Sequence, residues 1–411
     1  MAKPSETLTI EGFGGLKNAQ IVLRPFTLLI GPQSAGKSII TKLLHFFKKV
    51  PSEVFQAAKN DQSWKNFSDR SVQRFLKYFP DEAWPKKAFK ITLTNSDATY
   101  TIESSRKSDA GVSIQFPNFL HTELDELKHS TVDQELTERL FVERSKQHLG
   151  KTMCYHQRLI PAGRSFFASL EDNIFSLASE IDLDPFIAEF GHYYRKLRQI
   201  SNQNSGSSRA RNKLLTSAAD LIQSILKGTH HRDGKRDYVL MPDGRRTPLS
   251  LCSSGQQESL PLLLFLRHII GSQSLGIPEG LSIEEPEAHL FPDSQRAIVE
   301  LIAFAFNSSD DLAQVTVTTH SPFILGAVNV LLKAGSLHGS RSLNKNQLKK
   351  LDATVPKSRV LKTQQVAAWL IDRGTCQDLI SPQTNLIDDN PVDAALGGLI
   401  QDFDTLLSLE N

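Results

Sequence analysis

The stretch GPQSAGKS at residues 31–38 fits the pattern GxxxxGK[ST] at every position. An apolar run at residues 27–30 precedes it and is typical of a buried strand, and a helical pattern starts after Gly36. In this strand–loop–helix arrangement, the N–H groups of the loop and of the helix start point at phosphate oxygens. The alternative is a Gly-rich turn that matches by chance, and the flanking strand and helix disfavour it.

The loop also supplies two side chains with a clear chemistry. Lys37 brings a positive charge to the β- and γ-phosphates, and Ser38 offers a hydroxyl ligand for Mg²⁺. We therefore expect ATP and Mg²⁺ as cofactors. The expected nucleotide-binding residues of this loop are Gly31, Pro32, Gln33, Ser34, Ala35, Gly36, Lys37, Ser38 and Ile39.

A second element, LSIEEPE, occupies residues 281–287. Its apolar start predicts a strand that ends at two glutamates. Beside a phosphate loop, Glu284 can hold Mg²⁺, and Glu285 can polarise the attacking water. Adjacent glutamates taken alone usually lie on a solvated surface. The preceding strand and the phosphate loop favour the functional interpretation.

Two further stretches carry weaker signals. Residues 251–258, LCSSGQQE, precede an apolar helix and could form a second phosphate-binding end, although alone they indicate only a helix cap. His320 follows a β-branched stretch and could contact the γ-phosphate, although a lone histidine is more often structural. The expected phosphate contacts of the first stretch are Ser253, Ser254, Gly255 and Gln256.

In their order along the chain, these motifs resemble the ABC-type ATPase head that SMC-like repair proteins and OLD-family proteins share. The matching stretches are GPQSAGKS, SSGQQ, EEPEAHLFP and THSPF, and the resemblance covers residues 5–50 and 245–330. It implies that Lys37, Glu285 and His320 are the catalytic residues, with His320 as the switch histidine.

The resemblance also implies that the signature loop at 253–256 reaches the ATP held by a second head, and hence a homodimer or a higher homo-oligomer. It also implies a Q-loop glutamine, for which Gln157 is the candidate. Gln157 is then an expected metal ligand, together with Ser38 and Glu284. Two departures stand out. The Walker B acid is Glu284 rather than the more usual Asp, and the signature reads CSSGQ rather than LSGGQ.

The stretch LIPAGRSF at 159–166 and the IEEPEAHLFP box further resemble defence-associated AAA-type ATPases, in particular the ATPase subunits of PARIS anti-phage systems, whose partner is a Toprim nuclease. OLD nucleases carry a Toprim domain after the head, with a DxD motif behind an apolar strand. Here the late DxD at 402–404 lies in a helix-like pattern. The resemblance therefore implies an effector in trans, together with a phage-encoded trigger.

The stretch between Lys37 and Ser253 lacks the sustained heptads of an SMC-type arm. We expect an α/β fold: an ABC-type P-loop ATPase head with a mixed sheet, plus an inserted helical lobe. The expected parts are an N-terminal part of the head (1–116), the helical lobe (117–235), a part of the head with signature, Walker B and switch histidine (236–330), and a C-terminal part with an acidic tail (331–411).

Composition indicates the cellular compartment and the absence of an expected membrane segment. The chain has 411 residues and only three cysteines, its start has no apolar signal region, and its longest strongly apolar stretch, 260–266, is far below the roughly 20 residues of a membrane span. We therefore expect a cytoplasmic protein without a membrane segment.

The net charge is only +2, but the charged residues are unevenly distributed along the chain. Residues 191–213 contain six basic and no acidic residues, whereas seven acidic and no basic residues follow Arg373. The basic run could contact nucleic acid, meet an acidic partner, or form a solvated helical hairpin. Without a global basic field, DNA is possible but not favoured as a partner.

Three functions are compatible with these features. The favoured one is an ATP-hydrolysing sensor and scaffold that controls a separate effector in anti-phage defence. The alternative is an SMC-like DNA-repair ATPase that clamps DNA when ATP closes the head dimer. A transport ATPase subunit is the third, and the EEPEAHLFP box argues against it.

Overall fold

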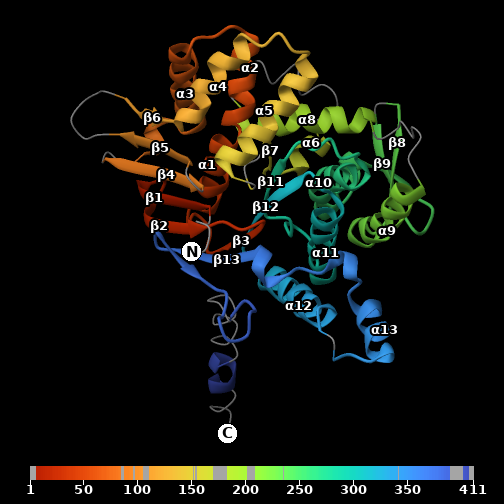
Figure 1. Ribbon diagram of the computed structural model, residues 1–411. Helices are drawn as coiled ribbons and strands as arrows, with labels where there is room; N and C mark the ends of the chain where they lie inside the picture. Colours follow the sequence, from red (N-terminus) through yellow and green to blue (C-terminus); the bar gives the residue numbers. More distant parts are fainter. Residues whose placement is uncertain are drawn as a thin grey trace.

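The structure is a computed structural model of the chain (Figure 1). It describes residues 6–84, 88–95, 98–104, 111–150, 152, 155–169, 183–200, 209–234, 236–340, 342–388 and 401–406. Within these ranges, no helix is both long and apolar enough to cross a membrane.

A six-stranded sheet forms the centre of the molecule. Its strands in spatial order are β14 (Thr375–Asp378), β13 (Val366–Asp372), β3 (Phe26–Ile30), β12 (Leu312–Thr319), β11 (Glu279–Glu284) and β7 (His156–Ile160). All neighbours are parallel except β13 and β14, which pair antiparallel. Every residue of β3 is buried, as expected for a parallel strand covered on both faces. The carboxyl ends of these strands therefore meet at one edge of the sheet.

A five-stranded antiparallel sheet packs beside the central one. Its order is β2 (Leu16–Val22), β1 (Thr7–Phe13), β4 (Phe89–Asn95), β5 (Ala98–Ser104) and β6 (Ser113–Gln115). Burial alternates along β4, so one face of this sheet is covered and the other is more open.

Two hydrophobic cores lie on opposite faces of the central sheet, and its strands contribute to both. Phe26, Leu28 and Ile30 of β3 belong to one core, whereas Leu29 belongs to the other. The same alternation divides the residues of β13. This follows from the two-residue period of a strand.

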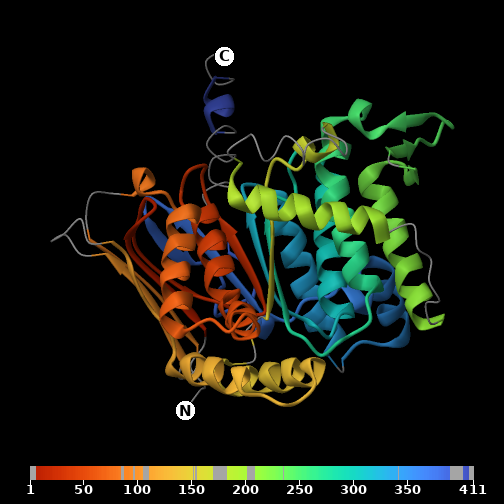
Figure 2. The ribbon, with the colours of Figure 1, turned by 90° about the horizontal axis from the view of Figure 1, so that it is seen from above.

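The first core holds the helices that follow β7 in the chain and a small sheet (Figure 2). The helices are α6 (Ser165–Ser169), α8 (Pro185–Ile200), α9 (Arg209–Leu226), α10 (Ser254–Gly271), α11 (Pro292–Ser308), α12 (Pro322–His338) and α13 (Lys345–Thr354). The small sheet consists of β8 (Thr229–Asp233), β9 (Arg236–Leu240) and β10 (Arg246–Pro248).

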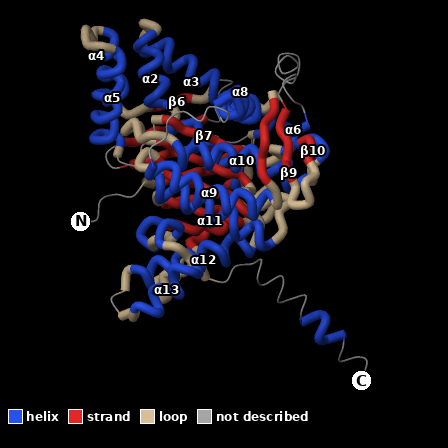
Figure 3. Tube along the Cα trace, turned by 90° about the vertical axis from the view of Figure 1, so that its right-hand side faces the viewer, coloured by secondary structure: helices blue, strands red, loops and turns tan. Residues whose placement is uncertain are grey.

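The second core lies between the two larger sheets and the N-terminal helices. These are α1 (Lys37–Lys48), α2 (Val50–Lys59), α3 (Trp64–Tyr78), α4 (Asn118–Lys128) and α5 (Gln134–Leu149). Helix α1 buries Ile40, Leu43, Leu44 and Phe47, which share one face at helical spacing. The helices α4 and α5 lie at one end of the molecule and α13 at the other (Figure 3).

The α/β fold with a mixed sheet is confirmed. The range 117–235, however, is not one separate helical lobe in the structure. It contains β7, a strand of the central sheet. Its helices also divide, because α4 packs on α2 while α9 packs on α10 and α11. Helical periodicity in a sequence marks an apolar face but not the element that covers it.

Candidate nucleotide-binding site

The loop 31–36 connects the carboxyl end of β3 to α1 and is shaped by its glycines. A side chain at Gly31 would collide with the carbonyl oxygen of Ile371 on β13. Gly36, the N-cap of α1, has a φ of 104° and lies against Leu16. Only glycine adopts this conformation without strain, so the loop can stay close to its neighbours and leave the N–H groups at the start of α1 open.

Lys37 is buried under this loop. Its Nζ donates to the carbonyl oxygens of Gly31 and Pro32 at 2.8 and 2.7 Å, and lies 3.3 Å from Nδ1 of His320. Burial lowers the pKa of Lys37 to about 8, and the carboxylates of Glu285, Glu287 and Glu284 act in the opposite direction. The Lys37 ammonium therefore begins to lose its proton near pH 8.

His320 connects Lys37 to Glu285. Its Nε2 lies 3.0 Å from Oε1 of Glu285. A lysine ammonium can only donate, so Nδ1 of His320 accepts from Lys37 and Nε2 carries the hydrogen that Glu285 accepts. The structure thus brings together the three residues expected to act in catalysis.

Glu284, the last residue of β11, lies against the first turn of α1. Its Oε1 accepts from the Thr41 hydroxyl at 2.9 Å, and Oε2 accepts from the N–H of Ala162 at 3.4 Å. The same hydroxyl lies 3.0 Å from the carbonyl oxygen of Ser38. Thr41 therefore links the Glu284 carboxylate to the backbone of Ser38, a role that the sequence did not reveal.

The residues present fit Mg²⁺. This ion commonly takes one or two protein oxygens and completes its shell with phosphate oxygens and water. Ser38 is exposed, and the Glu284 carboxylate approaches the same turn of α1. Among the residues described, no group of three or more His, Cys, Asp or Glu could form an all-protein metal cage.

Gln157, the remaining expected metal ligand, is not brought to this group. It lies on β7 opposite Gly280, well before the carboxyl end of the strand. Its Nε2 donates to the Ser282 hydroxyl at 3.2 Å inside the sheet. The part of this segment that does reach Glu284 is the backbone of Ala162.

Glu287 belongs to the site, although no role was expected for it. Its Oε1 accepts from the Thr319 hydroxyl at 2.5 Å and from the N–H of His320 at 2.9 Å. Its Oε2 is buried without a hydrogen-bond partner, and burial raises the pKa of the carboxyl group. Glu287 thus fixes the backbone of His320.

The stretch 253–256 caps helix α10. The Ser253 hydroxyl accepts from the N–H of Gln256, whose side chain accepts in return from the N–H of Ser253. Gln256 also donates to the carbonyl oxygen of Leu226 at 2.9 Å. Ser253 and Ser254 are exposed, whereas Gln256 is buried. The serines are therefore open to a second molecule, and Gln256 is occupied within its own chain.

Gly255 lies against the segment that follows Glu287. A side chain at Gly255 would come within 2.6 Å of the carbonyl oxygen of His289. The start of α10 and the turn after β11 consequently form one continuous surface.

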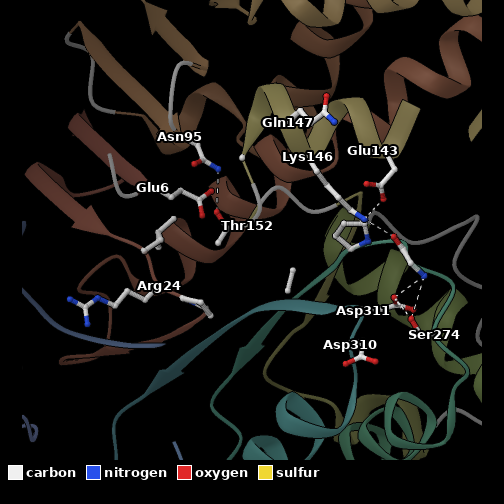
Figure 4. A pocket seen from close by; sticks show the side chains of 16 residues that line it. Glu6, Arg24, Asn95, Glu143, Lys146, Gln147, Thr152, Ser274, Asp310 and Asp311 are labelled. Atoms are coloured by element: carbon white, nitrogen blue, oxygen red, sulfur yellow. Dashed lines mark hydrogen bonds and ion pairs between the residues drawn. The ribbon is translucent and has the colours of Figure 1, made fainter. Parts of the chain in front are cut away.

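A cavity of about 770 Å³ lies at the amino edge of the central sheet (Figure 4). The N–H groups of Leu275 and Gly276 donate to Asp311 at 2.7 and 3.0 Å, and Lys146 donates to Glu143 at 2.6 Å. Asn95 also donates to Thr152. Several polar groups of this cavity thus pair with one another.

Comparison with known proteins gives a family, a curated relative and a set of solved structures. The family described as "AAA ATPase domain" matches residues 6–158 and 65–325, which together make up most of the chain. The OLD nuclease of Thermus scotoductus is 23% identical over 331 residues, which are 77% of this chain and 58% of that protein. The chain thus spans less than two thirds of this relative's length.

Solved structures of SMC heads are similar at low scores. The SMC head domain from Thermotoga maritima has a TM-score of 0.36 at 12% identity, over 90% of this chain and 97% of that one. An SmcHead bound to the C-winged helix domain of ScpA has a TM-score of 0.42 at 12% identity, over 91% and 97% of the two chains.

Proposed function

Because this chain belongs to the AAA ATPase domain family, we propose that it binds ATP with Mg²⁺ at residues 31–39 and hydrolyses it to ADP and phosphate. The observation that carries this proposal is the chain of contacts from Lys37 through His320 to Glu285. It joins the phosphate loop after β3, through His320 at the end of the adjacent β12, to a carboxylate at the end of β11, one strand further along the sheet.

The roles of the residues follow from their chemistry. Lys37 neutralises phosphate oxygens, and Glu285 accepts the proton of the attacking water while the bond between the γ-phosphorus and the bridging oxygen breaks. His320 holds the Glu285 carboxylate through Nε2. Ser38 and Glu284 would hold Mg²⁺, which supplies charge neutralisation of the phosphates when bound.

We further propose that two copies of the chain close on the nucleotide. Two large apolar side chains flank the surface formed by α10 and the turn after β11. Leu251 is 75% exposed just before Ser253, and Phe291 is 73% exposed shortly after His289. Apolar side chains so exposed beside open serines suit burial against a second copy.

In the cell, the proposed role is that of a sensor and scaffold that controls a separate effector, a Toprim nuclease, in anti-phage defence and responds to a phage-encoded trigger. The likeness to an OLD nuclease, at 23% identity over 331 residues, supports a link to nuclease activity. The short α4–α5 hairpin also offers no long arm for a DNA clamp.

The experiment combines turnover with partner identification. The purified protein should release phosphate from ATP in the presence of Mg²⁺, and light scattering should show dimers or larger assemblies. Affinity purification at native expression levels, followed by mass spectrometry, should recover a nuclease. A protein that instead binds duplex DNA more tightly with ATP, with a steep salt dependence, would be the DNA-clamp ATPase.

A further inference from the structure

Arg164 is the most completely buried cationic side chain near the site, with an exposed fraction of 0%. It lies in the turn between β7 and α6. Its guanidinium donates to four carbonyl oxygens: those of Pro161 at 3.0 Å, Glu258 at 3.0 Å, Glu284 at 2.6 Å and Glu285 at 2.9 Å. The planar fork of an arginine is suited to such a set of fixed acceptors.

Glu258 completes the arrangement from the second turn of α10. Its Oε1 accepts from the N–H of Arg164 at 2.9 Å, and its Oε2 accepts from the N–H of Ser165 at 2.7 Å. Oε1 also lies 3.3 Å from Nη2 of Arg164. Both side chains are almost wholly buried, so the pair is a rigid charge-assisted connection between α10 and the turn after β7.

The conformation of Glu285 gives this connection its importance. Glu285 has a φ of 44°, in the left-handed region that non-glycine residues rarely adopt. Its N–H donates to the carbonyl oxygen of Thr318 at 3.0 Å, and its own carbonyl oxygen accepts from Arg164. These bonds hold the backbone on both sides of the strained residue, and the carboxylate is thereby aimed at His320.

We infer that Arg164 and Glu258 are positioning residues that couple the start of helix α10 to the orientation of Glu285. This inference rests on the proposed ATPase function. Helix α10 begins with the open serines Ser253 and Ser254, so contact of a second copy there is transmitted through Glu258 and Arg164 to the Glu285 backbone. Turnover therefore responds to assembly through Glu285, in addition to any contact that the second copy makes with the nucleotide.

The test is E258Q, which keeps the shape of the side chain and removes its charge. The matched control is L263A, on the same helix and equally buried, where the change does not touch Arg164. Both variants are assayed well below their own melting midpoints. For E258Q we expect kcat to fall at least about 20-fold with KM for ATP within about twofold, because Glu285 and not the phosphate loop is disturbed. For L263A we expect kcat within about threefold of the unchanged protein.

A second measurement does not depend on turnover. Amide hydrogen exchange of residues 285–288 should become at least about tenfold faster in E258Q and stay unchanged in L263A. Unchanged exchange and unchanged kcat in E258Q overturn the inference, and so does an equal loss in L263A. If E258Q does not fold, R164K takes its place with the same expectations. If the unchanged protein does not hydrolyse ATP, the proposed function is wrong. The hydrogen-exchange measurement still tests whether Glu258 and Arg164 are coupled to the Glu285 backbone.

Discussion

The two edges of the central sheet use buried polar residues in opposite ways. At the amino edge, Glu6 pairs with Lys48 at 2.6 Å and accepts from Gln314 at 2.9 Å. At the carboxyl edge, Glu287 keeps one oxygen without a partner and Glu285 adopts a left-handed φ. The charges at the amino edge thus pair with each other and stabilise the fold. Those at the carboxyl edge have a strained backbone or an unpaired oxygen, as is typical of sites that act on a ligand.

The largest expected effect tests the strained carboxylate. E285Q should bind ATP and lower kcat by about 10²- to 10⁴-fold, because the amide cannot accept the proton of water. Phosphate release and binding of a fluorescent ATP analogue measure the two quantities. E143Q, at the rim of the amino-edge cavity, is the control and should keep kcat within about twofold. Equal turnover in E285Q and the unchanged protein would show that the carboxyl edge of the sheet contributes no more to catalysis than the amino edge.

The same substitution at both edges compares their contributions to stability. E6Q should lower the free energy of unfolding by about 3–5 kcal/mol, because it leaves Lys48 as an uncompensated buried charge. E287Q should change it little, since Glu287 has a raised pKa and an unpartnered oxygen. Urea denaturation measures both values. A loss in E287Q as large as in E6Q would contradict the comparison.

Lys37 tests the charge of the phosphate loop. K37A should weaken ATP binding by about 10²-fold, as expected when charge-assisted hydrogen bonds to phosphate are lost. K146A is the matched control, because Lys146 pairs with Glu143 at the amino edge. We expect its affinity for ATP to stay within about twofold. Equilibrium binding without turnover, in the E285Q background, gives both affinities.

The smallest effect is on pH dependence. The pKa of Lys37 is lowered to about 8 by burial, and a bound triphosphate raises it again. Above pH 8 binding must therefore take up a proton, so the affinity for ATP should fall by up to about tenfold per pH unit, and it should be flat below. K37R keeps its charge throughout and should lack this slope, even if it binds more weakly. A flat profile in the unchanged protein would show that Lys37 does not titrate in this range.

The sequence predicted those parts of the site that are contiguous in the chain. The loop 31–38 and the pair Glu284–Glu285 lie at strand ends, where an apolar run followed by Gly or Glu is visible without a structure. His320 was found in the same way. In each case the local pattern determines the position, because parallel strands bring their carboxyl ends together.

The remaining parts depend on tertiary contacts and were missed or misplaced. Thr41 reads as an ordinary helix residue, and only the fold brings it to Glu284. The pairing of Arg164 with Glu258 joins positions far apart in the chain, and only the fold brings them together. Gln157 was expected to be the Q-loop glutamine, but the strand register buries it inside the sheet. No local pattern specifies register or partner.

The shared central sheet has a consequence for how the chain can be divided. Leu29 of β3 packs in one core, whereas Phe26, Leu28 and Ile30 pack in the other. Both cores therefore depend on this strand. A truncation that removes either group of helices leaves an apolar face of the sheet in water. We therefore expect the two groups of helices to unfold together, as one cooperative unit with the central sheet.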